Sequence, residues 1–216
     1  MAQFIVDFQA FKDEYNRYIL KEMAIISVHT NEVAHCLIKP PHVLSKLSSN
    51  SRASVKYLQR NHHGIFWEDG YTSYTEAIRL LKDITENAEK ILIKGLERAR
   101  YIETITGKPT VDFDSLHCPR AKQLPCISSA PDCFYYRHTS TYQAYFEACS
   151  LKRVYKLKRW YLEYLKSTTV PIPPEKTEDE YDTTEKGYDV SPSRIHQCLR
   201  SGPVASESKF TRSSYR

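Results

Sequence analysis

The chain has 216 residues, of which 41% are hydrophobic and 26% are charged, a composition typical of one soluble globular domain with a proper core. Its net charge of +5 permits contact with nucleic acid but does not require it, because a binding surface needs clustered charge. No 18-residue apolar run predicts a transmembrane helix, and the N-terminus lacks the basic segment of a secretory signal. We therefore expect a cytoplasmic or nuclear protein without a membrane partner, whose six cysteines stay reduced.

The first 40 residues predict three strands, at 4–8, 18–28 and 33–38, separated by polar turns. Strands joined by short turns pair antiparallel. We therefore expect the first strand to be central, with the second and third antiparallel to it. Pro40 and Pro41 end the third strand, because proline cannot donate to a ladder.

Helices and strands then alternate. A short helix is expected before Gly64, and Ser73 with Glu76 fits the capping box of a second helix whose apolar spacing continues to Ala88. Gly107 is the expected stop of a third helix. The remaining predicted elements are a strand at 91–93, the third helix at 96–105, a strand at 110–113 and a long last helix at 141–166.

The composition changes after Thr169, where prolines and an acidic run precede a segment rich in Ser, Thr and Arg. Such a segment cannot bury enough apolar surface to offset its ordering entropy. We therefore predict one domain over residues 1–167 and a disordered tail over 168–216 that is available to protein partners. The order of elements predicts an α/β domain of RNase H-like (exonuclease-like) type, with a mixed sheet flanked by helices.

A nuclease of this type would hold two metal ions on several carboxylates, the first of them in the first strand. Asp7 occupies that place, but Gln9 stands where exonucleases carry a second acid on the same face. Asp112 and Asp114 offer the other paired spacing. These acids would form a magnesium or manganese site only if they converge on Asp7; otherwise Asp7 is a sheet-end or hairpin residue.

Cysteine and histidine suggest a second site. Tetrahedral zinc takes thiolate, imidazole and carboxylate ligands. Cys133, His138 and Cys149 are spaced more loosely than in a zinc finger, so spacing alone leaves open whether the cysteines are ligands or small buried residues. The other residues of this group are His117, Cys118 and Cys126, with Glu22 and Cys36 further upstream.

The last predicted helix carries Lys152, Lys156 and Arg159 in one stripe opposite its apolar face. Such a stripe is either a solvated surface or a track that contacts the phosphates of a nucleic acid. His62 and His63, which precede Gly64, indicate a polar turn. The sequence thus names one candidate nucleic-acid contact, on the last helix.

A family resemblance covers roughly residues 3–166. It rests on the runs IVDFQAF, KEMAII, HCLIKPPHVL, NHHGIFWEDG and ILIKGLERARYI, then a Cys–His–Cys segment that leads into LKRVYKLKRWYLEYL. Together they resemble a group of arthropod proteins often encoded near mobile elements or viruses. More distantly, the order of segments is similar to the Maelstrom domain of the piRNA pathway, which implies an RNase H-like fold whose catalytic acids are lost.

The Maelstrom resemblance also implies a Glu-Cys-His-Cys zinc set, with Cys-x2-His-x8-Cys before the last helix. The matching residues here are Glu22, Cys133, His138 and Cys149, and both gaps of the Cys–His–Cys trio are two residues longer than in that pattern. Cys118 or Cys126 could take one of the three places. The zinc would be structural, because four protein ligands leave no open position.

The sequence therefore predicts an atypical RNase H-like protein that binds nucleic acid, single-stranded RNA in particular, in RNA silencing or mobile-element biology. The sixteen tyrosines offer rings for base stacking. The resemblance implies RNA binding and, in some members, RNA cleavage without the standard acids, so enzyme status stays open with a non-enzyme favoured. Two alternatives remain: a metal-dependent 3′–5′ exonuclease that uses Asp7 with Asp112 or Asp114, and a protein-interaction scaffold.

Overall fold

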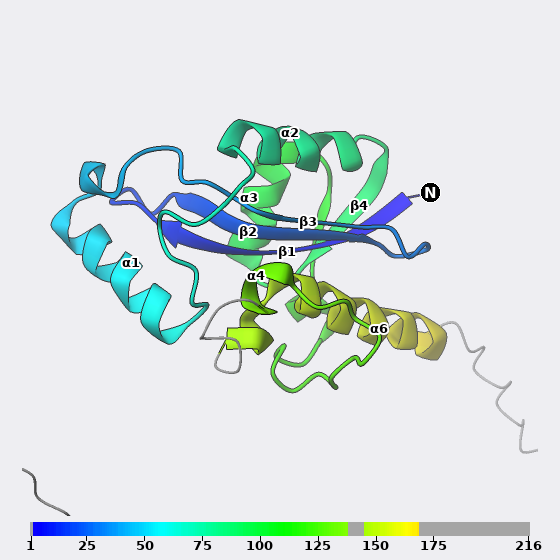
Figure 1. Ribbon diagram of the computed structural model, residues 1–216. Coiled ribbons are helices and arrows are strands. Elements are labelled where there is room, and N and C mark those ends of the chain that lie inside the picture. The colour runs from blue at the N-terminus through cyan, green and yellow to red at the C-terminus, as the bar shows by residue number, and fades with distance from the viewer. Residues whose placement is uncertain (1, 138–144, 169–216) are drawn as a thin grey trace, which may run out of the picture. The chain divides into compact units, whose positions relative to one another are not determined.

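The computed structural model describes residues 2–137 and 145–168 (Figure 1). A five-stranded mixed sheet has the order β3-β2-β1-β4-β5. Its β1–β2 and β2–β3 pairs are antiparallel, and its β1–β4 and β4–β5 pairs are parallel. The strands are β1 (Ala2–Lys12), β2 (Tyr18–Ser27), β3 (Val33–Leu37), β4 (Ala88–Ile93) and β5 (Thr110–Asp112). The predicted α/β class and central first strand are confirmed, but β3 is antiparallel to β2 and therefore runs parallel to β1.

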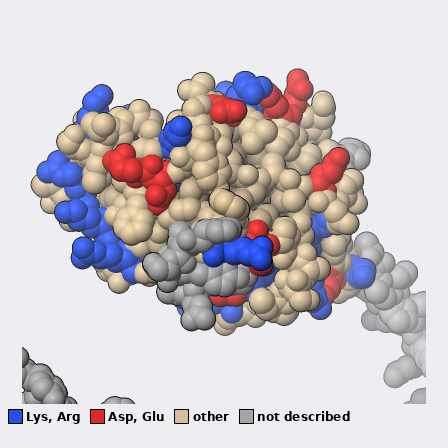
Figure 2. Space-filling view, viewed as in Figure 1, with Lys and Arg blue, Asp and Glu red and all other residues tan. Residues whose placement is uncertain are grey.

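Helices cover both faces of the sheet, with α2 and α3 on one face and α4 and α6 on the other (Figure 1). Helix α1 packs at one end, where a row of Lys and Arg follows the edge of the molecule (Figure 2). The α-helices are α1 (Ser49–Asn61), α2 (Tyr74–Ile84), α3 (Leu96–Thr106), α4 (Phe134–Arg137) and α6 (Ser150–Thr168). Short 3-10 helices cover Leu44–Lys46 (η1), Phe113–Leu116 (η2) and Phe146–Ala148 (η3).

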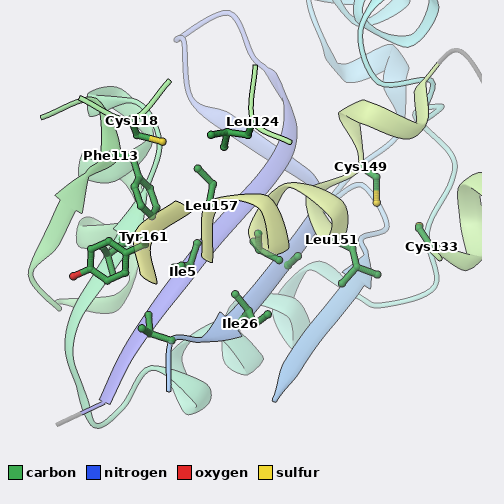
Figure 3. Close-up of a cluster of buried hydrophobic side chains, with 14 of the residues drawn as sticks. Ile5, Ile26, Phe113, Cys118, Leu124, Cys133, Cys149, Leu151, Leu157 and Tyr161 are labelled. Atoms are coloured by element: carbon green, nitrogen blue, oxygen red, sulfur yellow. The ribbon is translucent and has the colours of Figure 1, made fainter. Parts of the chain in front are cut away.

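The two-residue period of the strands creates two separate cores. Ile5 and Ile26 point toward α6 and pack with Leu157 of that helix (Figure 3). Val6 and Ile25, their neighbours in sequence, belong to the core beneath α2 and α3. By the same alternation Asp7, Gln9 and Glu22 face the α6 side, so three polar side chains lie within or beside a largely apolar layer.

Two helix ends agree with the sequence and two do not. The Ser73 side chain accepts a hydrogen bond from the Glu76 N–H, and Gly107 ends α3 with φ of 67°. Helix α2 stops at Ile84, however, and Ala88 begins β4, so the apolar spacing there continued through a turn. Helix α6 begins at Ser150, after η3, and a carboxylate oxygen of Glu22 from β2 accepts the Ser150 N–H at 3.0 Å; the predicted start at 141 lies outside the described residues.

Two further expectations concern the ends of the chain and the membrane. None of the helices in the described part is long and apolar enough to cross a bilayer. The predicted tail, residues 168–216, lies outside the described residues except for Thr168, where α6 ends.

Candidate metal centre and the adjoining Asp7 site

Glu22, His35, Cys133 and Cys149 form a candidate metal centre at the start of α6. Each offers one ligand atom, and the four atoms lie within 4.8 Å of one another. Within residues 2–137 and 145–168, no other group of three or more His, Cys, Asp or Glu side chains meets this criterion. Three of the four are buried, and Figure 3 shows the two cysteines next to each other at the end of the core beneath α6.

Four separate segments supply these side chains. Glu22 comes from β2 and His35 from β3, whereas Cys133 precedes α4 and Cys149 precedes α6. The Glu22 carboxylate lies 2.9 Å from His35 Nε2 and accepts a hydrogen bond from the Cys149 thiol at 3.3 Å. Its second oxygen receives the first N–H of α6. The helix N-terminus thus helps to compensate a carboxylate that has no exposed surface.

Without a metal ion, His35, Cys133 and Cys149 would differ widely in how tightly each holds its proton. Burial by itself lowers the pKa of His35, but hydrogen bonds with Cys133 and Glu22 and their negative charge raise it to about 9. The interaction with the neighbouring Cys149 thiol, together with the hydrogen bond to His35, outweighs burial and lowers the pKa of the Cys133 thiol to about 4. The interaction with Cys133, burial and the Glu22 charge raise the pKa of Cys149 above its ordinary range. The centre therefore holds negative charge that a divalent cation would neutralise.

The structure brings together three of the four residues matched from the family pattern, Glu22, Cys133 and Cys149, and it adds His35 as the imidazole. His138 lies outside the described residues. Cys36 belongs to the core on the opposite face of the sheet, so it is not part of the centre. The other candidates are also elsewhere: Cys118 is buried near Phe113, Cys126 is exposed, and His117 is the left-handed C-cap of η2.

A strand-pairing argument could have found His35. In the β2–β3 ladder His35 pairs with Ala24, and Glu22 pairs with Leu37. Paired residues of an antiparallel ladder share a face, and Ala24 is two residues from Glu22. His35 therefore lies diagonally across from Glu22 on the α6 side, while its neighbour Cys36 points the other way. The alternation of His35 and Cys36 is visible in the sequence, but it identifies His35 as a partner of Glu22 only once the β2–β3 register is known.

Asp7, the candidate nuclease acid, is fully buried and lies between two guanidinium groups. Arg98 Nη1 of α3 is 2.9 Å from one carboxylate oxygen, and Arg153 Nε of α6 is 3.3 Å from the other. Burial lowers the pKa of Arg98, and the Asp7 charge opposes that shift. Arg98 also lies over the Phe8 ring, 4.2 Å from its centroid. Asp7 is therefore neither a sheet-end nor a hairpin residue but the anion of a buried ion-pair triad.

The other nuclease candidates do not join Asp7 in a metal-binding group among the described residues. Asp112 accepts the N–H groups of Gly95 and Asp114, which fixes the start of η2. Asp114 forms an ion pair with Lys94 at 2.5 Å. Gln9 donates its amide to the Ala148 carbonyl at 2.5 Å. These three side chains are thus engaged in hydrogen bonds or ion pairs with other groups of the fold.

The expected stripe on the last helix is not a free cationic surface. Lys152 is buried and donates to the Ala130 carbonyl and the Asp132 carboxylate, and Lys156 is buried and pairs with Glu147. Arg159 is the solvent-exposed member, and it forms an i,i+4 pair with Glu163 at 3.1 Å. The first two residues therefore anchor the segments that precede α6.

The sequence reasoning missed a basic surface on α1. Residues 39–67 contain five Lys or Arg and no Asp or Glu. Lys46, Lys56 and Arg60 are exposed and form no ion pair with another described residue. Figure 2 shows this basic row along the edge that α1 forms, and Tyr57, 58% exposed, lies within it.

A groove of 950 Å³ adjoins the C-terminal end of α1. Gln9 and Arg153 line it beside the Asp7 triad, and Asn61 and His62 line it from α1. The rest of its lining comes from the segments before α4 and α6: Arg120, Ala121, Lys122, Gln123, Tyr145, Glu147 and Ala148. Its one acid, Glu147, is paired with Lys156, so the groove is basic and amide-rich.

No protein-family model matches the chain, and a search of curated proteins found no match either. The geometry of the chain's own residues therefore carries the functional argument.

Proposed function

We propose that the chain is an atypical RNase H-like protein that binds single-stranded RNA without two-metal cleavage and holds a structural zinc ion, in RNA silencing or mobile-element biology. The sheet order β3-β2-β1-β4-β5, with mixed pairing around a central β1, supports the RNase H-like assignment. The observation that carries the binding function is the basic surface of α1 that adjoins the groove beside Asp7.

Zinc is the cation that suits the Glu22, His35, Cys133 and Cys149 centre. Two thiolates and an imidazole favour zinc over magnesium or calcium, which prefer oxygen ligands. Zinc–ligand bonds of about 2.0–2.3 Å place tetrahedral ligands about 3.5 Å apart, so a small contraction of the centre suffices. Elemental analysis is expected to give one zinc per chain in the wild type and none in Cys133→Ser. Purified protein that contains no zinc and takes none up would contradict the assignment.

Phosphate contacts explain why the α1 surface suits a nucleic acid. Lys56 and Arg60 are four residues apart, which places them about 6 Å apart along one face of the helix. Cations in such a row neutralise successive phosphates and release counterions. Tyr57, exposed between them, provides a ring on which a base can stack. No acid interrupts this stretch of the chain, and of the two acids that line a pocket beside Tyr57, Asp13 and Glu14, the first is paired with Arg17.

Binding of a labelled single-stranded RNA, followed by fluorescence anisotropy, tests the function. Replacing Lys46, Lys56 and Arg60 together by Ala is expected to weaken binding and to reduce its salt dependence, by about 0.7 in the slope of log K against log salt for each lost phosphate contact. The matched control is Lys82→Ala, which removes an exposed lysine of α2; this variant should bind as the wild type does. A wild type that binds no RNA at low salt would favour the protein-interaction scaffold.

The exonuclease alternative is weaker because Asp7 already has two cationic partners. A metal ion at Asp7 would have to displace or repel Arg98 and Arg153, which lie 2.9 and 3.3 Å from its oxygens. We therefore expect no RNA or DNA cleavage when magnesium or manganese is added. Cleavage that requires either ion and is lost in Asp7→Asn would restore the alternative.

A further inference from the structure

Beyond the α1 surface, we propose that Arg153, held by Asp7, is a phosphodiester-binding residue that takes the place of a metal ion in the lining of the groove. This inference rests on the proposed RNA-binding function and assigns a specific contact within it. The ligand is a backbone phosphate of a bound single strand, held by a guanidinium group and not cleaved.

Charge is the first observation behind this proposal. The triad combines one carboxylate, Asp7, with two guanidinium groups, those of Arg98 and Arg153, and so carries an excess positive charge. Both arginines are mostly shielded from solvent, with 17% and 20% of their side-chain surface exposed. An excess charge in a partly desolvated place attracts an anion more strongly than an exposed lysine would.

The donors of Arg153 are the second observation. A guanidinium group has five N–H donors. Arg153 Nε lies 3.3 Å from an Asp7 oxygen as an ion pair without a hydrogen bond, and neither of its terminal nitrogens donates a hydrogen bond to a residue in the described part of the chain. Because Arg153 lines the groove, those terminal nitrogens are available to two oxygens of one phosphate in the bidentate geometry that arginine favours.

Position is the third observation. Asp7 holds Arg153 in the lining of the groove, and Gln9, two residues along the same face of β1, is fixed on the Ala148 carbonyl. Arg120 and Lys122 line the same groove and are exposed. An RNA strand that leaves α1 past Asn61 and His62 would therefore meet further basic side chains. The guanidinium group of Arg153 would hold one of its phosphates at the position where a nuclease would bind a metal ion.

Three variants of the full chain test the proposal with a labelled single-stranded oligouridylate, in buffer without added magnesium. The wild type should bind under these conditions, since no divalent ion takes part. Arg153→Ala should weaken binding about tenfold or more, the value of charged hydrogen bonds, and lower the salt slope by about 0.7. Arg153→Lys should keep the slope but regain only part of the affinity, because an ammonium group lacks the planar fork. Arg159→Ala, on the exposed face of the same helix, should change neither quantity.

The double variant Asp7→Asn/Arg153→Ala removes both partners of one ion pair but leaves Arg98 without its carboxylate, so its folding is compared with that of Arg153→Ala, in which Asp7 keeps Arg98 as its partner. It should show the same reduced slope, with melting temperature and metal content recorded for every variant. If Arg153→Ala and the double variant bind as the wild type while the α1 triple variant loses binding, the inference fails and the proposed function stands. If the wild type binds no RNA, both fail. An Arg159→Ala defect as large as that of Arg153→Ala would place the strand on the outer face of α6 and would also overturn the inference.

Discussion

Asp7 and Glu22 are two buried carboxylates on neighbouring strands and on the same face of the sheet, yet their charges are compensated in different ways. Glu22 pairs with Gln9 across the β1–β2 ladder, and Asp7 pairs with Ala24. Two arginines compensate Asp7, whereas an imidazole, a thiol and a helix N-terminus surround Glu22. The comparison shows how one sheet face can carry an acid paired with arginines and, two residues further along the β1–β2 ladder, a candidate metal centre.

The difference lies in which groups the last helix contributes. Cys149 and the Ser150 N–H, at the start of α6, reach Glu22, while Arg153, one turn later, reaches Asp7. Imidazole and thiol groups surround Glu22, and guanidinium groups surround Asp7. The Asp7 site therefore needs no metal to be stable, and the Glu22 site is expected to depend on one.

Loss of metal from the Glu22 centre should have the largest effect on stability. Cys149→Ser removes a ligand and leaves buried charge without its cation, so the free energy of unfolding should fall by about 5 kcal/mol or more, a fraction of the free energy with which structural zinc sites bind. Urea denaturation with and without a chelator measures it. Cys126→Ser, which changes an exposed cysteine, should behave as the wild type does. A melting temperature that ignores chelators would show that the centre does not stabilise the fold.

Removal of the anion from the triad should have the next largest effect. Asp7→Ala leaves Arg98 and Arg153 facing each other without compensation, and loss of one partner of a buried ion pair costs about 3–5 kcal/mol. Asp114→Asn is the matched control, because that carboxylate is 57% exposed and its pair with Lys94 should contribute about 1 kcal/mol or less. Equal denaturation midpoints for Asp7→Ala and Asp114→Asn would mean that the arginines do not depend on Asp7.

His63 represents a third way to bury a titratable group, by remaining neutral. Burial, with the charges of His62 and Lys21, lowers the pKa of His63 to about 4 from its ordinary value of 6.5. Its ring nitrogen accepts the Ile65 N–H, and the unfolded chain binds a proton more readily than the folded one. Stability should therefore be complete above pH 6.5 and fall as the pH drops toward 4, by about 3 kcal/mol at about 1.4 kcal/mol for each pKa unit.

His63→Asn, whose side-chain oxygen can accept the same N–H, isolates this contribution. The metal centre also protonates in acid, so the quantity to compare is the difference in unfolding free energy between the wild type and the variant across this pH range. That difference should shrink as the pH falls. A difference that stays constant would mean that His63 titrates at its ordinary pKa.

Local patterns predicted most of the fold, because strands and amphipathic helices depend on nearby residues. The central β1, the Ser73 cap and the Gly107 stop all follow from short segments. The start of α6 did not, since the group that accepts the Ser150 N–H is Glu22, 128 positions away.

The sites show the same limit. The family resemblance pointed to Cys133 and Cys149, but the imidazole near them comes from β3, where only strand register reveals which face His35 occupies. The arginines at Asp7 come from two helices and had no local signal. For the basic stripe the local signal was present but the expected exposure was wrong. Helical periodicity alone cannot show that Lys152 and Lys156 are buried and paired with Asp132 and Glu147.

The smallest expected effect distinguishes the exposed and buried members of that stripe. Arg159→Ala removes an exposed i,i+4 pair with Glu163 and should lower the free energy of unfolding by about 0.5 kcal/mol or less. Lys152→Ala leaves the Ala130 carbonyl without its charged donor and should cost about 1–3 kcal/mol. Urea denaturation of the two variants under one set of conditions compares them directly. Equal losses would mean that Lys152 is solvated as Arg159 is, and the segment before α4 would then need another anchor to keep Cys133 at the metal centre.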